Sequence, residues 1–308
     1  MREITDITTF TTQQPTVLTI GTFDGVHLGH QKIIERVVTT ARQEKLLATI
    51  FTFFPHPRMV VQHDKSLKLI HTLEEKKQLL QRLGVDLLVV QPFNEAFAQL
   101  TAEEFVSTIL VQHLNVKKVI IGYDHRFGRN RTANINDMRL FGEKYGFAVE
   151  EISVQEVDEV SVSSTKIREA LNKGDVTTAE HYLGVPYSLT GIVVHGLKLG
   201  RTLGYPTANI RVTEDYKLIP KDGVYAVYSY IGAQKVYGMM SIGKNPTIEG
   251  KGASIEVYFF DFNGDLYDRE LTIYFVKYLR EERKFSSVAL LKKQLQDDET
   301  TARKAIAL

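Results

Sequence analysis

The chain has 308 residues, enough for about two domains of ordinary size. Lys and Arg number 38 against 37 Asp and Glu, so the net charge is +1 and no global field attracts nucleic acid or a membrane surface. The sequence has no cysteine, which excludes disulfides, a thiolate nucleophile and a cysteine zinc site; with no signal pattern and no apolar run of about 18 residues, it fits a cytoplasmic protein.

Up to about residue 184, apolar runs alternate with helical patterns. Two helices begin at capping boxes, Thr72 with Glu75 and Thr101 with Glu104. We expect strands over 16–20, 47–54, 86–91, 117–122 and 147–153, and helices over 30–45, 73–83, 102–115, 136–145, 164–172 and 176–183. This alternation predicts a parallel sheet with helices on both faces and ligands outside the carboxyl ends of the strands.

The turn between the first strand and the first helix carries two histidines three residues apart. It reads Gly21-Thr22-Phe23-Asp24-Gly25-Val26-His27-Leu28-Gly29-His30. A helix N-terminus presents unpaired N–H groups and the positive end of the helix dipole, which suit phosphate, and glycine lets the backbone approach a ligand closely. The His-x-Gly-His pattern resembles the nucleotidyltransferase superfamily, whose members split ATP at the α-phosphate.

Three further segments follow later strands, so one crevice can collect them. They are Phe53-Phe54-Pro55-His56-Pro57, Gly122-Tyr123-Asp124-His125-Arg126-Phe127-Gly128 and Ser163-Ser164-Thr165-Lys166-Ile167-Arg168. Displacement at the α-phosphate of ATP needs positioning, positive charge and N–H donors where pyrophosphate leaves. Ser164 and Thr165 can donate to phosphate at a helix N-terminus, and Arg168 can bind it bidentately. As plain N-caps, the serines would have a structural role instead.

The four segments together resemble the FMN adenylyltransferase module of the bacterial bifunctional riboflavin kinase/FAD synthetases, over residues 16 to about 184. The resemblance implies flavin contacts from Phe54, Pro55, Asp124 and Phe127. The structural alternatives are a plain core role for Phe54 and Phe127 and the ordering of a turn by Asp124. It also implies contacts with ATP from Gly21, Phe23, Asp24, His27, His30, Ser164, Thr165 and Arg168. Among these, His27, His30 and Arg168 are the implied catalytic residues.

Two residues depart from the pattern of that family. His125 stands where relatives usually carry Phe, and Ala133 stands where they usually carry Gly. Either change can alter the affinity for flavin, and neither removes an implied catalytic group.

From Pro186 onward the hydrophobic pattern has period two, so we place the domain boundary between residues 185 and 186. Asn263-Gly264 predicts a hairpin turn. We expect strands over 187–195, 207–212, 223–231, 235–242, 254–262 and 271–278, and a helix over 286–306. Short strands at close spacing predict a small antiparallel barrel.

A glycine-rich segment, Gly196-Leu197-Lys198-Leu199-Gly200-Arg201-Thr202-Leu203-Gly204-Tyr205-Pro206-Thr207-Ala208-Asn209, joins a loop to a short strand. Its spacing fits neither a P-loop nor a kinase loop closely, and a hairpin loop is the structural alternative. Thr207 and Asn209 are two apart on a strand, so their side chains face the same way and can bind Mg²⁺ beside ATP oxygens. Glu256 can accept a proton from an attacking alcohol, unless it is a solvated carboxylate.

These residues belong to a second resemblance, to the riboflavin kinase module over residues 186 to 308. Further segments carry it: Gly223-Val224-Tyr225-Ala226, Ile242-Gly243-Lys244-Asn245-Pro246-Thr247 and Leu279-Arg280-Glu281-Glu282-Arg283-Lys284-Phe285. It implies Glu256 as the base for the riboflavin 5′-hydroxyl and Thr207 and Asn209 at Mg-ATP. It also implies further ligand contacts, with ATP from Gly196, Gly200, Arg201 and Gly204 and with flavin from Arg283.

The sequence therefore predicts an α/β nucleotidyltransferase-like domain over 1–185 and a riboflavin kinase β-barrel with a C-terminal helix over 186–308. The expected enzyme is cytoplasmic, requires Mg²⁺, and uses ATP to convert riboflavin to FMN and FMN to FAD, releasing pyrophosphate in the second step. We expect neither nucleic acid nor membrane as a partner and leave a homo-oligomer open. Two alternatives remain: one module is degenerate, or the chain is a flavin-binding regulator that acts on RNA or a protein.

Overall fold

The structure is a computed structural model that describes residues 1–64, 66–123, 125–153, 162–196, 199–243 and 254–306. The chain divides into two compact units, Met1–Ser164 and Thr165–Leu308. The domain boundary that the sequence places between residues 185 and 186 lies two helices beyond this division and stays a prediction.

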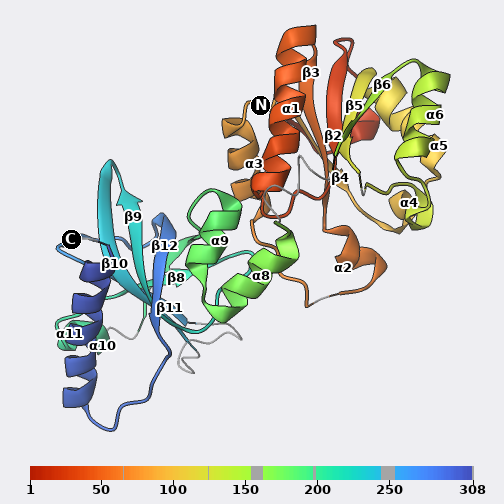
Figure 1. Cartoon of the computed structure of the whole chain (residues 1–308). Helices are drawn as coiled ribbons and strands as arrows, with labels where there is room; N and C mark the ends of the chain where they lie inside the picture. The colour runs from red at the N-terminus through yellow and green to blue at the C-terminus, as the bar shows by residue number, and fades with distance from the viewer. Residues whose placement is uncertain (65, 124, 154–161, 197–198, 244–253, 307–308) are drawn as a thin grey trace. The chain divides into compact units, whose positions relative to one another are not determined.

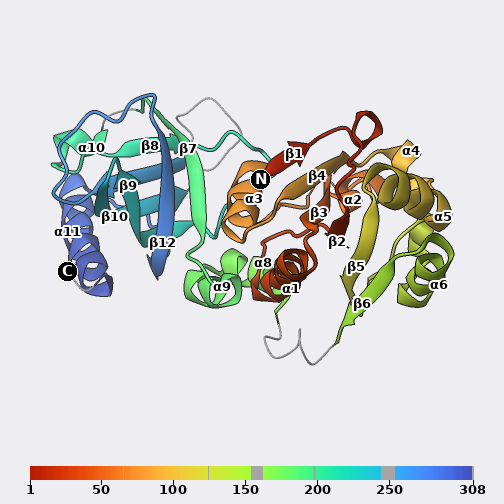
Figure 2. The ribbon, with the colours of Figure 1, turned by 90° about the horizontal axis from the view of Figure 1, so that it is seen from above.

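The first unit is built on a parallel sheet whose strands lie in the order β1-β4-β3-β2-β5-β6 (Figure 2). Every neighbouring pair in it is parallel. The strands are β1 (Arg2–Ile4), β2 (Thr16–Ile20), β3 (Leu47–Phe54), β4 (Leu87–Pro92), β5 (Val116–Gly122) and β6 (Ala148–Ile152). The chain passes from β2 to β3 on one side and places β5 on the other, so the strand order reverses beside β2. Ligands bind at such a reversal, outside the carboxyl ends of the strands.

Helices cover both faces of this sheet, as the alternating pattern predicts (Figure 1). On one face α1 and α3 pack over side chains such as Val17 and Ile50. On the other face η2 and α6 pack over Leu18 and Phe51. The helices are η1 (Ile7–Thr9), α1 (Leu28–Glu44), α2 (Pro57–Val61), α3 (Leu73–Arg82), α4 (Glu95–Ala98), α5 (Ala102–Glu104), η2 (Phe105–His113), η3 (Arg129–Arg131) and α6 (Ile135–Tyr145).

Local signals in the sequence set several of these boundaries. Both predicted capping boxes form, with Thr72 accepting from the N–H of Glu75 and Thr101 from that of Glu104. The helix predicted over 102–115 is only partly an α-helix, because residues 105–113 wind as a π-helix. Phe105, Val106, Ile109 and Leu110 of this helix are buried in the core.

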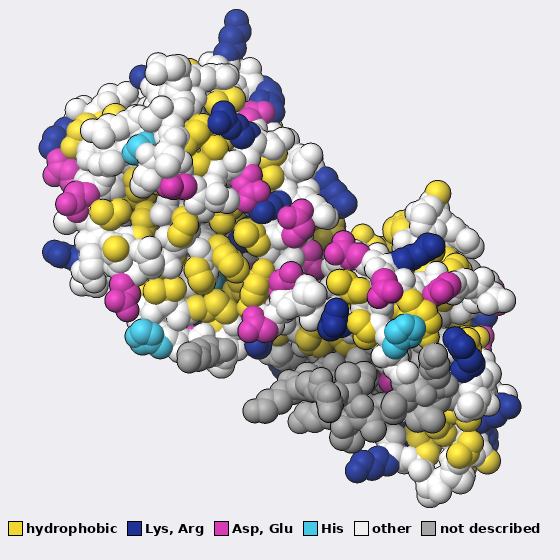
Figure 3. Space-filling model, turned by 180° about the vertical axis from the view of Figure 1, so that it is seen from behind, with side chains coloured by type: hydrophobic (Ala, Val, Ile, Leu, Met, Phe, Trp, Pro, Cys, Tyr) yellow, Lys and Arg dark blue, Asp and Glu magenta, His cyan; other side chains and the backbone are white. Residues whose placement is uncertain are grey.

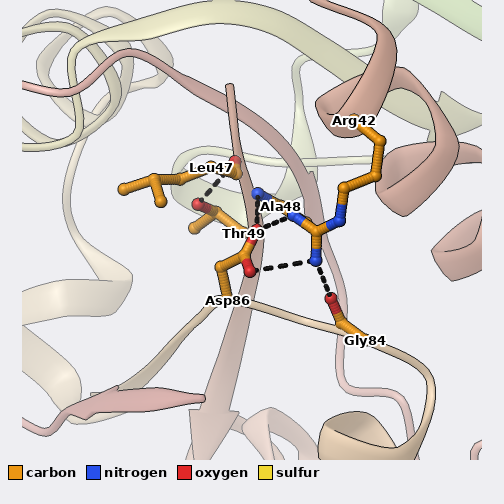
Figure 4. Close-up of polar contacts among 6 residues, drawn as sticks. All are labelled: Arg42, Leu47, Ala48, Thr49, Gly84 and Asp86. Atoms are coloured by element: carbon orange, nitrogen blue, oxygen red, sulfur yellow. Dashed lines mark hydrogen bonds and ion pairs between the residues drawn. The ribbon is translucent and has the colours of Figure 1, made fainter. Parts of the chain in front are cut away.

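A polar cluster joins the C-terminal part of α1 to the edge where β3 and β4 begin (Figure 4). The Arg42 guanidinium donates to both carboxylate oxygens of Asp86, at 2.6 and 3.0 Å, and to the Gly84 carbonyl at 2.9 Å. Asp86 also accepts the Ala48 N–H at 2.9 Å. The cluster fixes the end of the sheet opposite to the strand ends that carry the motifs.

The second unit is a closed antiparallel barrel, which confirms the predicted architecture. Its strands follow one another around the barrel as β10-β11-β8-β7-β12-β9. They are β7 (Ser188–Val194), β8 (Ala208–Arg211), β9 (Gly223–Ile231), β10 (Gln234–Gly243), β11 (Ser254–Phe259) and β12 (Glu270–Arg280). The helices of this unit are α8 (Ser164–Lys173), whose first residue lies in the first unit, α9 (Val176–Leu183), α10 (Leu199–Thr202) and α11 (Val288–Ala305).

The hairpin predicted at Asn263-Gly264 is wrong. β11 pairs with β10 and β8, and β12 pairs with β7 and β9, so the two strands that flank this dipeptide are not neighbours. Neither Asn263 nor Gly264 has the positive φ that a two-residue hairpin turn requires. Barrel closure decides the partners of these strands, and the dipeptide lies in an irregular connection.

Charged side chains of both signs are interspersed over the face shown in Figure 3, and among the coloured residues neither sign forms a large patch. This distribution agrees with a net charge of +1. Within the described residues, no helix is both long enough and apolar enough to cross a membrane.

Candidate functional sites

The loop between β2 and α1 has an unusual backbone. Phe23, Gly25 and Val26 all have positive φ, at 46°, 91° and 41°. Positive φ is uncommon for non-glycine residues and costs most for a β-branched residue such as Val26. Strained backbone of this kind persists only where surrounding contacts hold it, and it concentrates at functional sites.

Contacts from several parts of the chain hold this loop. The Asp24 carboxylate accepts the Ile70 N–H at 2.9 Å, and the Gln31 amide donates to the Val26 carbonyl at 2.8 Å. The Ser164 hydroxyl donates to the Asp24 carbonyl at 2.8 Å, so the first and fourth predicted motifs do lie together. Asp24 is buried and Phe23 is 3% exposed, so both have structural contacts, and their contact with ATP stays a prediction.

His27 and His30 stack on each other at the mouth of α1. Their ring centroids lie 3.7 Å apart, and the planes are inclined by 17°. His27 is the N-cap of the helix, because its Nδ1 accepts the His30 N–H at 3.3 Å. The Nδ1 atom of His30 is buried and has no hydrogen-bond partner among the described residues. A ligand atom at the helix mouth would complete this bonding.

Both histidines are neutral near pH 7. Burial lowers the pKa of His27 to about 4. Burial lowers the pKa of His30 well below its usual value, and electrostatic interactions with His27 and Lys76 lower it further. Each imidazole therefore offers one N–H donor, in the positive field at the N-terminus of α1. Contact of the pair with phosphate stays a prediction.

Lys76 was missed by sequence reasoning. It is 4% exposed, and its Nζ donates to the Thr22 carbonyl at 2.7 Å. Burial lowers its pKa to about 8, against an opposing effect of the Asp24 charge. Its position four residues after the Thr72 cap resembles that of any solvated helix lysine, so the sequence held no signal for it.

The remaining residues predicted at this phosphate site are divided between the units. Ser164 reaches the Asp24 carbonyl within the first unit. Thr165 and Arg168 belong to the second unit, on α8, so their part in the phosphate site stays a prediction.

The residues predicted to hold flavin differ in exposure. Phe54, partly buried, packs beside a core cluster, and Pro55, joined to it by a cis peptide bond, is exposed. Phe127 is 6% exposed and packs among core aromatics, so its flavin contact stays a prediction. Asp124 lies outside the described residues.

The two departures from the family pattern fit this structure without strain. Ala133 and Phe127 pair through backbone hydrogen bonds at 3.1 and 3.2 Å, and Ala133 is not among the residues with positive φ. Glycine is required instead at Gly128, where φ is 71° and a Cβ would come within 2.9 Å of the Ala102 nitrogen. The His125 ring stacks near Phe127, with centroids 6.1 Å apart.

In the second unit, polar side chains gather where β8 and β11 pair. Asn209 lies opposite Glu256 in the register. The Thr207 hydroxyl donates to Oε2 of Glu256 at 2.9 Å, and the Ser254 hydroxyl donates to Oε1 at 3.2 Å. Thr207 and Asn209 thus share a side of the strand, as predicted, and both lie beside the carboxylate.

The glycine-rich segment packs closely against this group. A Cβ at Gly196 would lie 2.3 Å from Nδ2 of Asn209, so only glycine leaves room for the Asn209 amide. A Cβ at Gly200 would lie 2.2 Å from the Tyr205 carbonyl oxygen. Gly204 has a φ of 86°, and Arg201 is exposed on the single turn of α10. Gly196 therefore packs tightly against Asn209 and Gly200 against Tyr205, and the contact of these glycines with ATP stays a prediction.

Arg283, predicted to touch flavin, is exposed on the connection between β12 and α11. Its neighbour Arg280 forms a bidentate ion pair with Asp298, at 2.7 and 2.6 Å, which ties the end of β12 to α11. The run of charges therefore contains one largely buried pair in addition to a solvated surface.

Two family models match the chain, FAD synthetase over residues 9–166 and riboflavin kinase over residues 183–306. Curated proteins named bifunctional riboflavin kinase/FMN adenylyltransferase are similar over most of their length. The protein of Listeria monocytogenes is 40% identical, covering 93% of this chain and 91% of its own. That of Escherichia coli K12 is 37% identical, with coverage of 96% and 94%.

A solved structure has a similar fold over its whole length. It is titled a macrolide-efflux protein from Streptococcus pneumoniae and is 35% identical in sequence. The two structures superpose with a TM-score of 0.88, and the match covers 98% of this chain and 98% of the other. Its title names a different activity from the names of the curated relatives, and we use the likeness for the fold.

Proposed function

This chain belongs to the family of bifunctional riboflavin kinase/FMN adenylyltransferases, and from that membership we propose which residues carry out its two reactions. The riboflavin kinase part transfers the γ-phosphoryl group of ATP to riboflavin and gives FMN. The FAD synthetase part transfers AMP from a second ATP to FMN and gives FAD and pyrophosphate. The enzyme is a transferase with riboflavin, FMN and ATP as substrates.

In the adenylyl transfer, a phosphate oxygen of FMN attacks the α-phosphorus of ATP, and the bond to the β-phosphate oxygen breaks in line as pyrophosphate leaves. The reaction needs positioning and charge stabilisation and no protein nucleophile. The observation that carries this proposal is the stacked pair His27–His30 at the N-terminus of α1, with the orphaned Nδ1 of His30. Neutral imidazole donors and helix N–H groups would stabilise the charge that develops on pyrophosphate.

Further residues complete the proposed site. Thr165 and Arg168 would bind phosphate from α8, with Arg168 as the cation that grips it bidentately. The flavin ring would lie against Phe54 at the end of β3 and Pro55 directly after it, with Asp124 and Phe127 from the loop after β5. The support for this placement is topological, because β2, β3 and β5 are neighbouring parallel strands that end at one edge.

In the kinase reaction, we assign the base to Glu256, which would accept the proton of the riboflavin 5′-hydroxyl as that oxygen attacks the γ-phosphorus. One carboxylate oxygen now accepts from Thr207 and the other from Ser254. Each carboxylate oxygen has a second lone pair, so Oε2 can accept the proton of the substrate while it keeps the bond from Thr207. Gly196, Gly200, Arg201 and Gly204 would contact ATP, and Arg283 would contact flavin.

The donor atoms of this site fit Mg²⁺. A hydroxyl, an amide oxygen and a carboxylate lie together at Thr207, Asn209 and Glu256, and these hard oxygen ligands suit that ion. Thr207 and Asn209 would hold it, and the ion would neutralise charge on the ATP phosphates. We place the enzyme in the cytoplasm, in accord with substrates that are cellular metabolites.

A pair of variants tests both assignments. His30→Ala should slow the conversion of FMN to FAD by about 10²- to 10³-fold, because it removes a donor to the leaving pyrophosphate, and leave riboflavin phosphorylation intact. Glu256→Ala should slow riboflavin phosphorylation by about 10²- to 10⁴-fold and leave FAD formation from supplied FMN intact. Products are followed over time by chromatography, with exposed His181→Ala and Glu270→Ala as controls.

Unchanged conversion of FMN to FAD by His30→Ala would refute the first site, and unchanged FMN formation by Glu256→Ala would refute the second. The wild-type time course also tests the alternatives. FMN alone would indicate a degenerate adenylyltransferase, and tight flavin binding without ATP turnover would indicate a regulator.

A further inference from the structure

Lys76 is buried near the N-terminus of α3, and both its burial and this position in the helix are unfavourable for a lysine. It is 4% exposed and occupies the first turn of α3, close after the N-cap Thr72. Burial of an ammonium group is costly, and the N-terminal end of a helix repels positive charge. The other charged residues of this turn, Glu74 and Glu75, follow the usual preference for acidic side chains. A compensating contact must therefore hold the lysine inside.

That contact is with the strained loop between β2 and α1. Nζ of Lys76 donates to the Thr22 carbonyl at 2.7 Å, and the same oxygen accepts the Thr52 hydroxyl at 3.2 Å. Thr22 directly precedes Phe23, the first residue of positive φ. The ammonium group thus binds the backbone at the start of the strained segment.

Three titratable side chains lie near Lys76, and their charges at pH 7 show which group is cationic there. Asp24 from the loop and His30 from α1 interact with the ammonium electrostatically. His27 and His30 are neutral near pH 7, because burial lowers the pKa of both. Among Asp24, His27, His30 and Lys76, only Lys76 is cationic at that pH. The positively charged side chain that contacts the loop is therefore Lys76, which belongs to none of the four sequence motifs.

We propose that Lys76 is a positioning residue of the adenylyltransferase site, whose buried ammonium fixes the Thr22 carbonyl and thereby holds the loop and the His27–His30 pair ready for the triphosphate of ATP. The inference rests on the function proposed above for the first unit. Lys76 acts through the backbone, because its hydrogen bond goes to the Thr22 carbonyl. The charge also raises the local positive potential, which favours the bound triphosphate.

Full-length Lys76→Met and Lys76→Arg test the proposal, with FMN and Mg-ATP as substrates. Lys76→Met, which keeps length but not charge, should raise the KM for ATP at least about tenfold with a smaller loss of kcat. Lys76→Arg should recover a large part of that affinity. Thr52→Val, which removes the uncharged bond to the same carbonyl, should have a smaller effect than Lys76→Met.

Two controls accompany these variants. Lys77→Met changes the adjacent lysine, which pairs with Glu3 at 2.8 Å on the surface, and should leave both reactions unchanged. Riboflavin phosphorylation in the same samples reports active protein, and a thermal melt reports the folding of the first unit. A folded Lys76→Met enzyme with wild-type KM and kcat for FAD formation overturns the proposal.

A pH profile decides the matter if Lys76→Met does not fold. The wild-type kcat/KM for FAD formation should fall as pH rises through about 8, because Lys76 then loses its proton. His30 faces the ammonium but does not titrate there, since its pKa is far lower. Lys76→Arg should lose this limb, because a guanidinium stays protonated. Identical wild-type and Lys76→Arg profiles overturn the proposal, whereas unchanged FAD formation by His30→Ala would refute the site itself.

Discussion

A histidine that must stay neutral makes folding sensitive to acid. His27 caps α1 through Nδ1, and burial lowers its pKa from 6.5 to about 4. Below its ordinary pKa the unfolded chain takes up a proton that the folded chain refuses, so the stability present above about pH 6.5 is lost as pH falls toward 4. The first unit therefore carries an acid-labile group at the N-terminus of α1, where we propose that phosphate binds.

We expect this single group to lower the free energy of unfolding by about 2 kcal/mol between neutral pH and roughly pH 5. His27→Asn replaces the capping acceptor Nδ1 with an amide oxygen that also caps helices, and it removes the titration, so it should abolish that part of the pH dependence. Urea unfolding followed by circular dichroism at the two pH values measures the difference. An identical pH dependence in both proteins would contradict the assignment.

Residue-level prediction from the sequence succeeded where chemistry is local. The pairing of two histidines at a helix mouth follows from their spacing after a strand, and the common side of Thr207 and Asn209 follows from the period of a strand. Lys76 could not be foreseen, because its role depends on a carbonyl 54 residues away. Ala133 is tolerated for a similar reason, since its φ depends on pairing with Phe127.

At the scale of elements, α11 is held to the barrel by a largely buried ion pair. Asp298 is 3% exposed and accepts both Arg280 bonds as well as the Gln294 amide at 2.9 Å. Arg280 ends β12, so the pair also fixes the connection that carries Arg283. Loss of one partner leaves a buried charge unsatisfied.

Asp298→Ala should therefore lower the free energy of unfolding by about 3 kcal/mol and weaken riboflavin binding, while FAD formation from FMN persists. The adjacent and exposed Asp297→Ala should change stability by no more than about 0.5 kcal/mol. Thermal melts and the KM for riboflavin measure both effects. Equal melting temperatures for the two variants would exclude a stabilising role for the pair.

Element prediction was reliable where a capping box or a long periodic run set the boundaries, as in α3 and α11. It failed at Asn263-Gly264, because the partners of β11 and β12 are chosen by barrel closure and not by the turn between them. It also missed β1, because this strand has only three residues and no local sequence pattern indicates that it pairs with β4.

At the scale of the whole chain, α8 and α9 mark where two units meet in sequence. Most of α8 and all of α9 lie in the second unit. The Lys221 N–H donates to the Leu171 carbonyl at 3.0 Å, and a Cβ at Gly174 would lie 3.0 Å from the Tyr278 ring. The period-two pattern that begins at residue 186 locates the barrel but says nothing about helices that pack on it.

A fragment of residues 165–308 should therefore melt at least about 5 °C above a fragment of residues 186–308, with riboflavin kinase activity in both. The reason is that the longer fragment keeps the contact of α9 with β12 and the bond from the Lys221 N–H to Leu171 on α8. Melting temperatures from circular dichroism decide between the two boundaries. Equal values would favour a domain that begins at residue 186.

The backbone strain at Phe23 and Val26 has a consequence for protein engineering. The ten residues from Gly21 to His30 depend for their shape on Ile70, Lys76 and Ser164, which come from distant parts of the chain. Grafted alone onto another strand–helix junction, the peptide would relax to ordinary backbone angles and lose the shape on which the proposed phosphate site depends. A working graft of this loop must therefore include the three contacts from Ile70, Lys76 and Ser164.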